Sequence, residues 1–125
     1  MPAYFNNTVY FGAVGDTLKA FTISNAKLAT PASSHTSVSF GYPGSTPSVS
    51  ANGTSGAIVW AVENNNGGVL HAYDATNLDD ELYNSNQAAN GRDQFHDNKF
   101  ITPMIANGKV FVGTPTGVIV LGMLQ

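Results

Sequence analysis

The chain has 125 residues, a length that allows one domain with a buried core. Hydrophobic residues make up 42% of the chain, which is a globular composition, but only 10% are charged, so Asn, Ser, Thr and Gly must supply much of the polar surface. A net charge of −3 with 5 basic residues excludes a nucleic-acid-binding patch and a polybasic membrane anchor, and the lack of cysteine excludes disulfides, thiolate metal ligands and thiol nucleophiles.

Three segments in chain order each predict the same series of short strands. The first begins at Pro2 and predicts strands after it, at 9–11, at 18–23 and near 37–40, with a tight hairpin turn at Asn6-Asn7. The second begins at Pro47, turns at 52–53, and predicts strands at 58–60, 69–73 and near 81–83, with a Gly-containing turn at 66–68. The third begins at Pro103, turns at 107–108, and predicts strands at 110–112 and 118–121.

The first and third segments match without a gap. Pro2 and Gly12 fall on Pro103 and Gly113, a constant offset of 101. The same offset continues past the glycines, where it aligns Leu18 with Ile119 and Ala20 with Leu121. The middle segment carries a three-residue insert, 54–56, at its turn. A match of this length indicates a true internal repeat.

The segments start 45 (Pro2 to Pro47) and 56 (Pro47 to Pro103) residues apart. Four short antiparallel strands in roughly 40–50 residues are typical of propeller blades. We therefore predict an all-β fold, a partial β-propeller of about three four-stranded antiparallel blades, with blade 1 at about 2–45, blade 2 at about 46–101 and an incomplete blade 3 at about 102–125. A β-sandwich with similar hairpins is the alternative. Residues 76–87 could include one helical turn, since Asp79, Asp80 and Glu81 suit a helix start.

The repeats resemble those of pyrroloquinoline-quinone (PQQ)-type β-propellers. The third segment shows the first half of that repeat, Thr102-Pro103 followed by Asn-Gly-Lys-Val-Phe-Val-Gly at 107–113. The middle segment shows the second half, Val-Leu-His-Ala-Tyr-Asp-Ala-Thr at 69–76 and then Glu-Leu-Tyr at 81–83. The positions that carry the structural repeat are Pro2, Gly12, Pro47, Asn52, Gly53, Asp74, Pro103, Asn107, Gly108 and Gly113.

The resemblance covers most of the chain and implies the last blades of a longer bacterial propeller protein, secreted or periplasmic. Met1-Pro2-Ala3-Tyr4 shows no signal peptide, and the longest apolar run, 118–124, is too short for membrane insertion. Tyr83 stands where family blades often place a docking Trp, and the chain reaches Gln125 right after the third strand of blade 3.

A partial propeller is expected to function by association with further blades. An arc of blades exposes two blade faces and an unpaired edge, and these are association sites. We therefore expect a non-catalytic structural or interaction module that assembles with copies of itself, as a closed homo-oligomer or a filament, or with the remaining blades of a parent protein. One alternative is the C-terminal part of a quinoprotein-like oxidoreductase, for which alone PQQ and calcium are expected as cofactors. The other is a carbohydrate-binding propeller. No residue is predicted to be catalytic or to bind a cofactor.

The densest polar cluster, residues 91–98, contains the candidate metal ligands Asp93, His96 and Asp97. A solvated loop with Asx turns is the alternative interpretation. His71 aligns with residues 19 and 120, so we expect it to face solvent or lie at an edge rather than act in catalysis.

Structural positions are also predicted for three polar residues at turns and for the aromatic residues on strands. Asp74 is expected to cap the turn that leaves the third strand of the middle segment. Asn6 and Asn52 match the glycosylation acceptor pattern on hairpin turns. The strand aromatics are expected to pack between blades; these are Tyr10, Phe11, Trp60, Tyr73 and Phe111.

Overall fold

The computed structural model describes residues 1–65 and 67–122, and it is an all-β structure of three antiparallel sheets, none of which closes on itself. Sheet 1 contains β1 (Ala3–Phe5), β2 (Thr8–Gly12), β3 (Asp16–Ser24), the short β4 (Lys27–Leu28) and β5 (Ser34–Phe40). Sheet 2 contains β6 (Ser48–Asn52), β7 (Ser55–Asn64), β8 (Gly68–Asp74) and β9 (Asn77–Asn84). Sheet 3 contains β10 (Met104–Ala106), β11 (Lys109–Thr114) and β12 (Gly117–Gly122).

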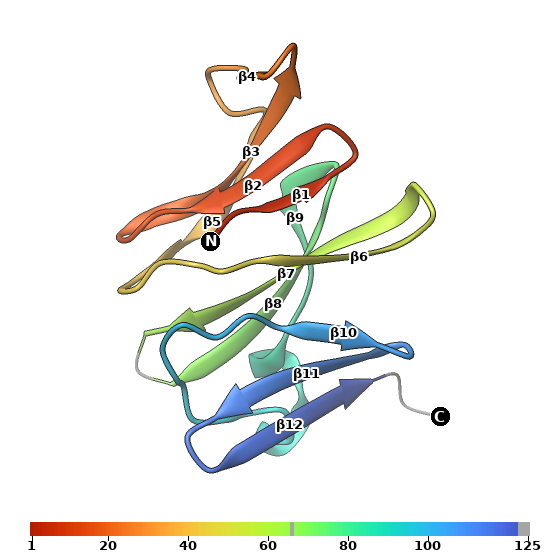
Figure 1. Ribbon diagram of the computed structural model, residues 1–125. Coiled ribbons are helices and arrows are strands. Elements are labelled where there is room, and N and C mark those ends of the chain that lie inside the picture. The colour runs from red at the N-terminus through yellow and green to blue at the C-terminus, as the bar shows by residue number, and fades with distance from the viewer. Residues whose placement is uncertain (66, 123–125) are drawn as a thin grey trace.

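The three sheets lie one above another in chain order, with sheet 2 in the middle (Figure 1). The all-β prediction is confirmed, and each sheet falls inside one of the three predicted segments. Within each sheet the chain passes to the adjacent strand at each turn, apart from the short β4 between β3 and β5. Two predicted features extend outside the described residues: the turn at 66–68 includes Asn66, and the incomplete blade 3 includes 123–125.

Asparagine and glycine determine the geometry of two hairpins. Asn6 and Asn7, between β1 and β2, have φ of 44° and 57°, and Asn107 and Gly108, between β10 and β11, have φ of 50° and 69°. Positive φ at both central residues defines the tight turn whose twist matches that of paired strands. These two turns hold β1 against β2 and β10 against β11 in the same register relative to their turns.

Sheet 2 is covered on both faces. On one side, the core between sheets 1 and 2 includes Tyr10, Leu18 and Phe40 from sheet 1, packed against Val59 and Tyr73 from sheet 2. The Tyr10 hydroxyl also donates a hydrogen bond of 2.8 Å to the carbonyl oxygen of Ala75 across this interface. On the other side, the core between sheets 2 and 3 is built on four buried residues, Val62, Leu70, Val110 and Val112.

The strand register corrects one detail of the predicted repeat. Phe11 pairs with Lys19, and Val112, the repeat partner of Phe11 at offset 101, pairs with Ile119. The third strands therefore match at an offset of 100 (119 − 19), so Leu18 corresponds to Val118 and not to Ile119. The reason is the turn between the second and third strands, which is one residue shorter in sheet 3 than in sheet 1.

The helical turn predicted within 76–87 does not begin at Asp79 to Glu81, because these residues belong to β9. Pairing with β8 and the complete burial of Leu78 favour the strand there. A single 3-10 turn, η1 (Ser85–Gln87), follows, and the Asn84 side chain caps it by accepting a hydrogen bond of 3.2 Å from the Asn86 N–H. A second such turn is η2 (Ala89–Gly91). Among the described residues, no helix has the length and apolar character to cross a bilayer.

Candidate functional site

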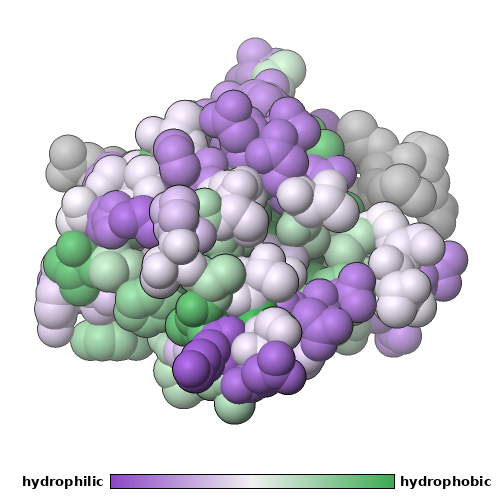
Figure 2. All heavy atoms as spheres, turned by 90° about the horizontal axis from the view of Figure 1, so that it is seen from above, coloured by the Kyte–Doolittle hydropathy of each residue, from purple (hydrophilic) through white to green (hydrophobic). Residues whose placement is uncertain are grey.

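The outer face of sheet 1 is the first candidate interaction surface. Side chains alternate along a strand, so the neighbours of the buried Tyr10 and Leu18 point away from sheet 2. This outer face carries Tyr4, Val9, Phe11 and Phe21, which neighbour one another through the strand register. Tyr4 is 63% and Phe11 45% exposed. Phe11 was expected to pack between blades, and this expectation is wrong for the chain as described. Seen from the side of sheet 1, the surface mixes hydrophobic and hydrophilic residues (Figure 2).

The outer face of sheet 3 is the second candidate surface. Met104, Phe111 and Val120 lie side by side across its three strands, with Val118 two residues before Val120 along β12. Met104, Val118 and Val120 are exposed and Phe111 is half-buried. Within residues 1–65 and 67–122, β12 pairs only with β11, so its other edge is free. Sheets 1 and 2 have a fourth strand, β5 and β9, at the corresponding place.

The repeat relates these two outer faces to the buried ones. At the offset of 101, the exposed Tyr4 and Phe11 and the half-buried Val9 correspond to Ile105, Val112 and Val110, which pack against sheet 2. In the opposite sense, the buried Tyr10 corresponds to Phe111 on the outer face of sheet 3. Each outer face thus repeats the type of surface that is buried between neighbouring sheets.

The structural repeat positions lie at strand ends and turns. Pro47 and Pro103, just before β6 and β10, are buried, whereas Pro2 is exposed. The backbone of Gly12 lies close to Ser45, because a Cβ on Gly12 would lie 2.7 Å from the Cβ of Ser45. At the end of β8, Asp74 Oδ1 accepts hydrogen bonds from the Thr76 N–H (2.7 Å) and hydroxyl (2.6 Å). The remaining members lie in or beside hairpin turns or late in β11: Asn52, Gly53, Asn107, Gly108 and Gly113.

The three candidate metal ligands have different surroundings. The carboxylate of Asp93 accepts hydrogen bonds from Arg92 Nε (2.7 Å) and Nη2 (3.0 Å) and from the Tyr83 hydroxyl (2.6 Å). The Arg92 guanidinium, together with Tyr83, lowers the pKa of Asp93 to about 2. His96 is exposed, and Asp97 is half-buried. Among the described residues, no group of three or more His, Cys, Asp or Glu is placed to hold a metal ion.

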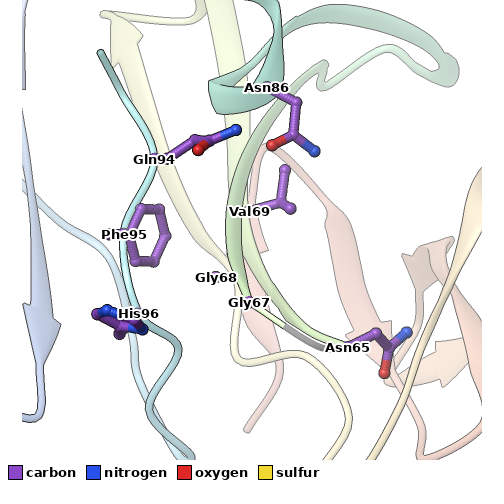
Figure 3. A pocket seen from close by; sticks show the side chains of 8 residues that line it. All are labelled: Asn65, Gly67, Gly68, Val69, Asn86, Gln94, Phe95 and His96. Carbon is purple, nitrogen blue, oxygen red and sulfur yellow. The ribbon is translucent and has the colours of Figure 1, made fainter. Parts of the chain in front are cut away.

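His96 borders a pocket of about 460 Å³ at the start of β8. Asn86 and Gln94 lie at one end of this pocket and Asn65 at the other, with Phe95 and Gly68 between them (Figure 3). The Phe95 ring occupies the space where a Cβ on Gly68 would be, and the Gly68 N–H donates a 3.1 Å hydrogen bond to the Phe95 carbonyl. The lining offers amide groups and one imidazole, which can hydrogen-bond a polar ligand.

A larger groove, of about 910 Å³, lies between sheets 2 and 3. Its apolar lining includes Trp60, Ile105 and Leu121, and its polar lining includes the Arg92–Asp93 pair. The Trp60 indole N–H donates a hydrogen bond of 2.9 Å to Ser50 Oγ, which fixes the ring plane. Tyr83 lies in the wall of this groove. Burial is the largest cause that raises the pKa of its hydroxyl to about 12, and the hydrogen bond to Asp93 is the next largest.

His71 differs most from its prediction, because it is only 4% exposed and does not face solvent. Its Nε2 lies 3.0 Å from Glu63 Oε2 and its Nδ1 lies 2.5 Å from Glu81 Oε1. The three side chains come from β7, β8 and β9. Strand pairing brings them together, since Ala61 pairs with His71 and Tyr73 with Glu81. A rule of alternation counted from the buried Val59 and Ala61 would have placed Glu63 on the face of sheet 2 that sheet 1 covers.

Comparisons of the chain with protein-family models, with curated proteins and with solved structures found no match. The resemblance to PQQ-type propellers therefore stays a prediction.

Proposed function

We propose that the chain is a non-catalytic interaction module whose three sheets are consecutive blades of a β-propeller, and that it assembles with copies of itself through its two outer faces. One observation carries this proposal. The apolar residues on the outer face of sheet 1 are the repeat equivalents of residues that sheet 3 buries against sheet 2, with Phe11 matching Val112.

The proposed contact places the outer face of sheet 3 of one copy on the outer face of sheet 1 of the next. This is a head-to-tail contact, which forms a ring if the rotation closes and a filament if it does not. Apolar burial of about 25 cal/mol per Å² would drive it, as it drives the packing of the sheets within one chain. Further blades of a longer parent protein could cover the same faces, and the experiment separates these two cases.

The test is the mass of the purified chain by light scattering after size exclusion, over a range of protein concentrations. We expect the wild type to form a multimer or an open polymer. Val120→Asp places an unpaired carboxylate in the contact and should give a folded monomer, as a charge is costly to bury without a partner. Val14→Asp is the matched control, since Val14 is exposed in the turn between β2 and β3 and lies on neither outer face.

A well-folded wild-type monomer at all concentrations would overturn self-assembly and leave other blades as the partner. A multimer that persists unchanged in Val120→Asp would show that the contact lies elsewhere.

Carbohydrate binding is a second candidate, favoured by the groove between sheets 2 and 3. An indole ring can stack on a sugar face, and the nearby Arg92–Asp93 pair can hydrogen-bond hydroxyl groups. A glycan array is the direct measurement, with Trp60→Ala expected to abolish any signal. An array without signal for the wild type would remove this candidate.

A further inference from the structure

We propose that His71 is held as an imidazolium between Glu63 and Glu81, and that this proton fastens β9 and the contact between sheets 1 and 2 in a pH-dependent way. The inference is independent of the proposed assembly, because the cluster lies between sheets 1 and 2 and not on an outer face.

Hydrogen-bond chemistry requires the proton. Both ring nitrogens of His71 are within hydrogen-bonding distance of a carboxylate oxygen. An ionised carboxylate only accepts, and a neutral imidazole has one N–H donor and one acceptor. Two carboxylates can therefore both be satisfied only by the imidazolium, which has two donors and makes short charge-assisted bonds.

Asparagines orient both carboxylates toward the ring. Asn65 Nδ2 donates to Glu63 Oε1 (3.0 Å), and Asn84 Nδ2 donates to Glu81 Oε2 (2.9 Å). In each glutamate, one carboxylate oxygen therefore accepts from an asparagine and the other faces His71.

Two aromatic side chains of the described part of the chain pack against the imidazole. The ring of Tyr73 from β8 stacks on the imidazole with centroids 5.7 Å apart and 9° between the planes. Phe40 from β5 meets the imidazole edge-on at 6.1 Å and is the uncharged neighbour from sheet 1. Within residues 1–65 and 67–122, the titratable side chains recorded against His71 are Glu63, Glu81 and Tyr73. Burial, and then the charges of Glu81 and Glu63, raise the pKa of Tyr73.

Loss of the proton would act on the packing of the two sheets. A neutral imidazole would direct a lone pair at one carboxylate, which repels β7 or β9 from β8. β9 also contacts sheet 1, where the Leu78 N–H donates to Ser34 Oγ (3.1 Å) of β5. If the folded chain keeps a proton that the unfolded chain releases, its stability falls as pH rises.

The first experiment observes the wild-type imidazoles by ¹⁵N NMR, in solution or with magic-angle spinning according to particle size. The exposed His35 and His96 serve as internal references. At neutral pH we expect both nitrogens of His71 to carry a proton, because each lies within hydrogen-bonding distance of a carboxylate oxygen. A neutral His71 with one unprotonated nitrogen at pH 6 to 8 would overturn the proposal, and no variant has to fold for this result.

The second experiment measures chemical unfolding against pH for the wild type, His71→Gln and the matched control His96→Gln. We expect the folded-to-unfolded ratio of the wild type, relative to His71→Gln, to fall as pH rises, by up to about tenfold per pH unit, as one extra bound proton in the folded chain requires. His96→Gln should follow the wild type. Parallel curves for the wild type and His71→Gln would contradict the proposed role.

Discussion

Leu18 and Val118 occupy the same place in the repeat but have opposite exposures, and this pair gives the most direct test of the stacked architecture. Leu18 pairs with Gly12 and is 0% exposed, whereas Val118 pairs with Gly113 and is 63% exposed. The perturbation is truncation of each to alanine.

The expected losses in unfolding free energy differ several-fold. For Leu18→Ala, about three methylene equivalents at about 0.8 kcal/mol each, together with the cavity left behind, give about 3 kcal/mol. For Val118→Ala, two methyl groups would give about 1.6 kcal/mol if fully buried, and only about a third of the side chain is covered, so the loss should be about 0.5 kcal/mol in a dilute monomer.

Urea unfolding followed by circular dichroism measures both losses. At high protein concentration, assembly through the outer face of sheet 3 should raise the cost of Val118→Ala toward the buried value, while the cost of Leu18→Ala stays constant. Equal losses for the two variants in the dilute monomer would refute the stacking order, because both faces would then be equally covered.

Three further outcomes follow from single contacts. Tyr10→Phe removes the hydroxyl that donates to the Ala75 carbonyl and should cost about 1–3 kcal/mol in urea unfolding, since a buried acceptor loses its partner. Asp93→Asn should remove an acid-sensitive contribution: the pKa of Asp93 is lowered to about 2, so the wild type should lose stability relative to the variant as pH falls from about 4 toward 2. Gly68→Ala should cost about 1–3 kcal/mol in thermal or urea unfolding, because the new methyl group overlaps the Phe95 ring.

Each of these changes has a matched control in the chain. Tyr4→Phe removes an exposed hydroxyl that donates to Asn7 Oδ1, and it should change stability by less than about 0.5 kcal/mol. Gly117→Ala meets no atom within 4 Å, so it should be nearly neutral. For the acid prediction, Asp97→Asn is the comparison. Controls that cost as much as the tested variants would show that the named contacts are not the cause.

Much of the fold could be predicted from local chemistry. The Asn6-Asn7 and Asn107-Gly108 pairs tolerate positive φ, so they indicate hairpin turns, and the alternating apolar residues around them indicate strands. The register of the third strand could not be read from the repeat. The turn before this strand differs by one residue between sheets 1 and 3, so an ungapped alignment matches side chains that lie on opposite faces of their sheets.

The side-chain cluster around His71 was missed for a related reason. Nothing beside His71 in the sequence indicates its partners, because Glu63 and Glu81 lie 8 and 10 residues away on the adjacent strands. Only the strand pairing makes them neighbours. Comparison with Lys19 at the equivalent position was misleading, because that residue lies on the uncovered face of sheet 1, whereas sheet 1 itself covers His71.

The position of sheet 2 between two neighbours has a consequence for how the chain opens. In a stack where each unit contacts only those beside it, the end units exchange their amide hydrogens through local fluctuations, and the middle unit does so only when the cooperative structure is lost. Backbone amides of β7 and β8 should therefore form the slowest-exchanging group and those of β12 the fastest among the paired strands. A partner that covers sheet 1 or sheet 3 would slow amide exchange in that sheet. The order of exchange rates along the chain would therefore reveal which of the two sheets the partner contacts.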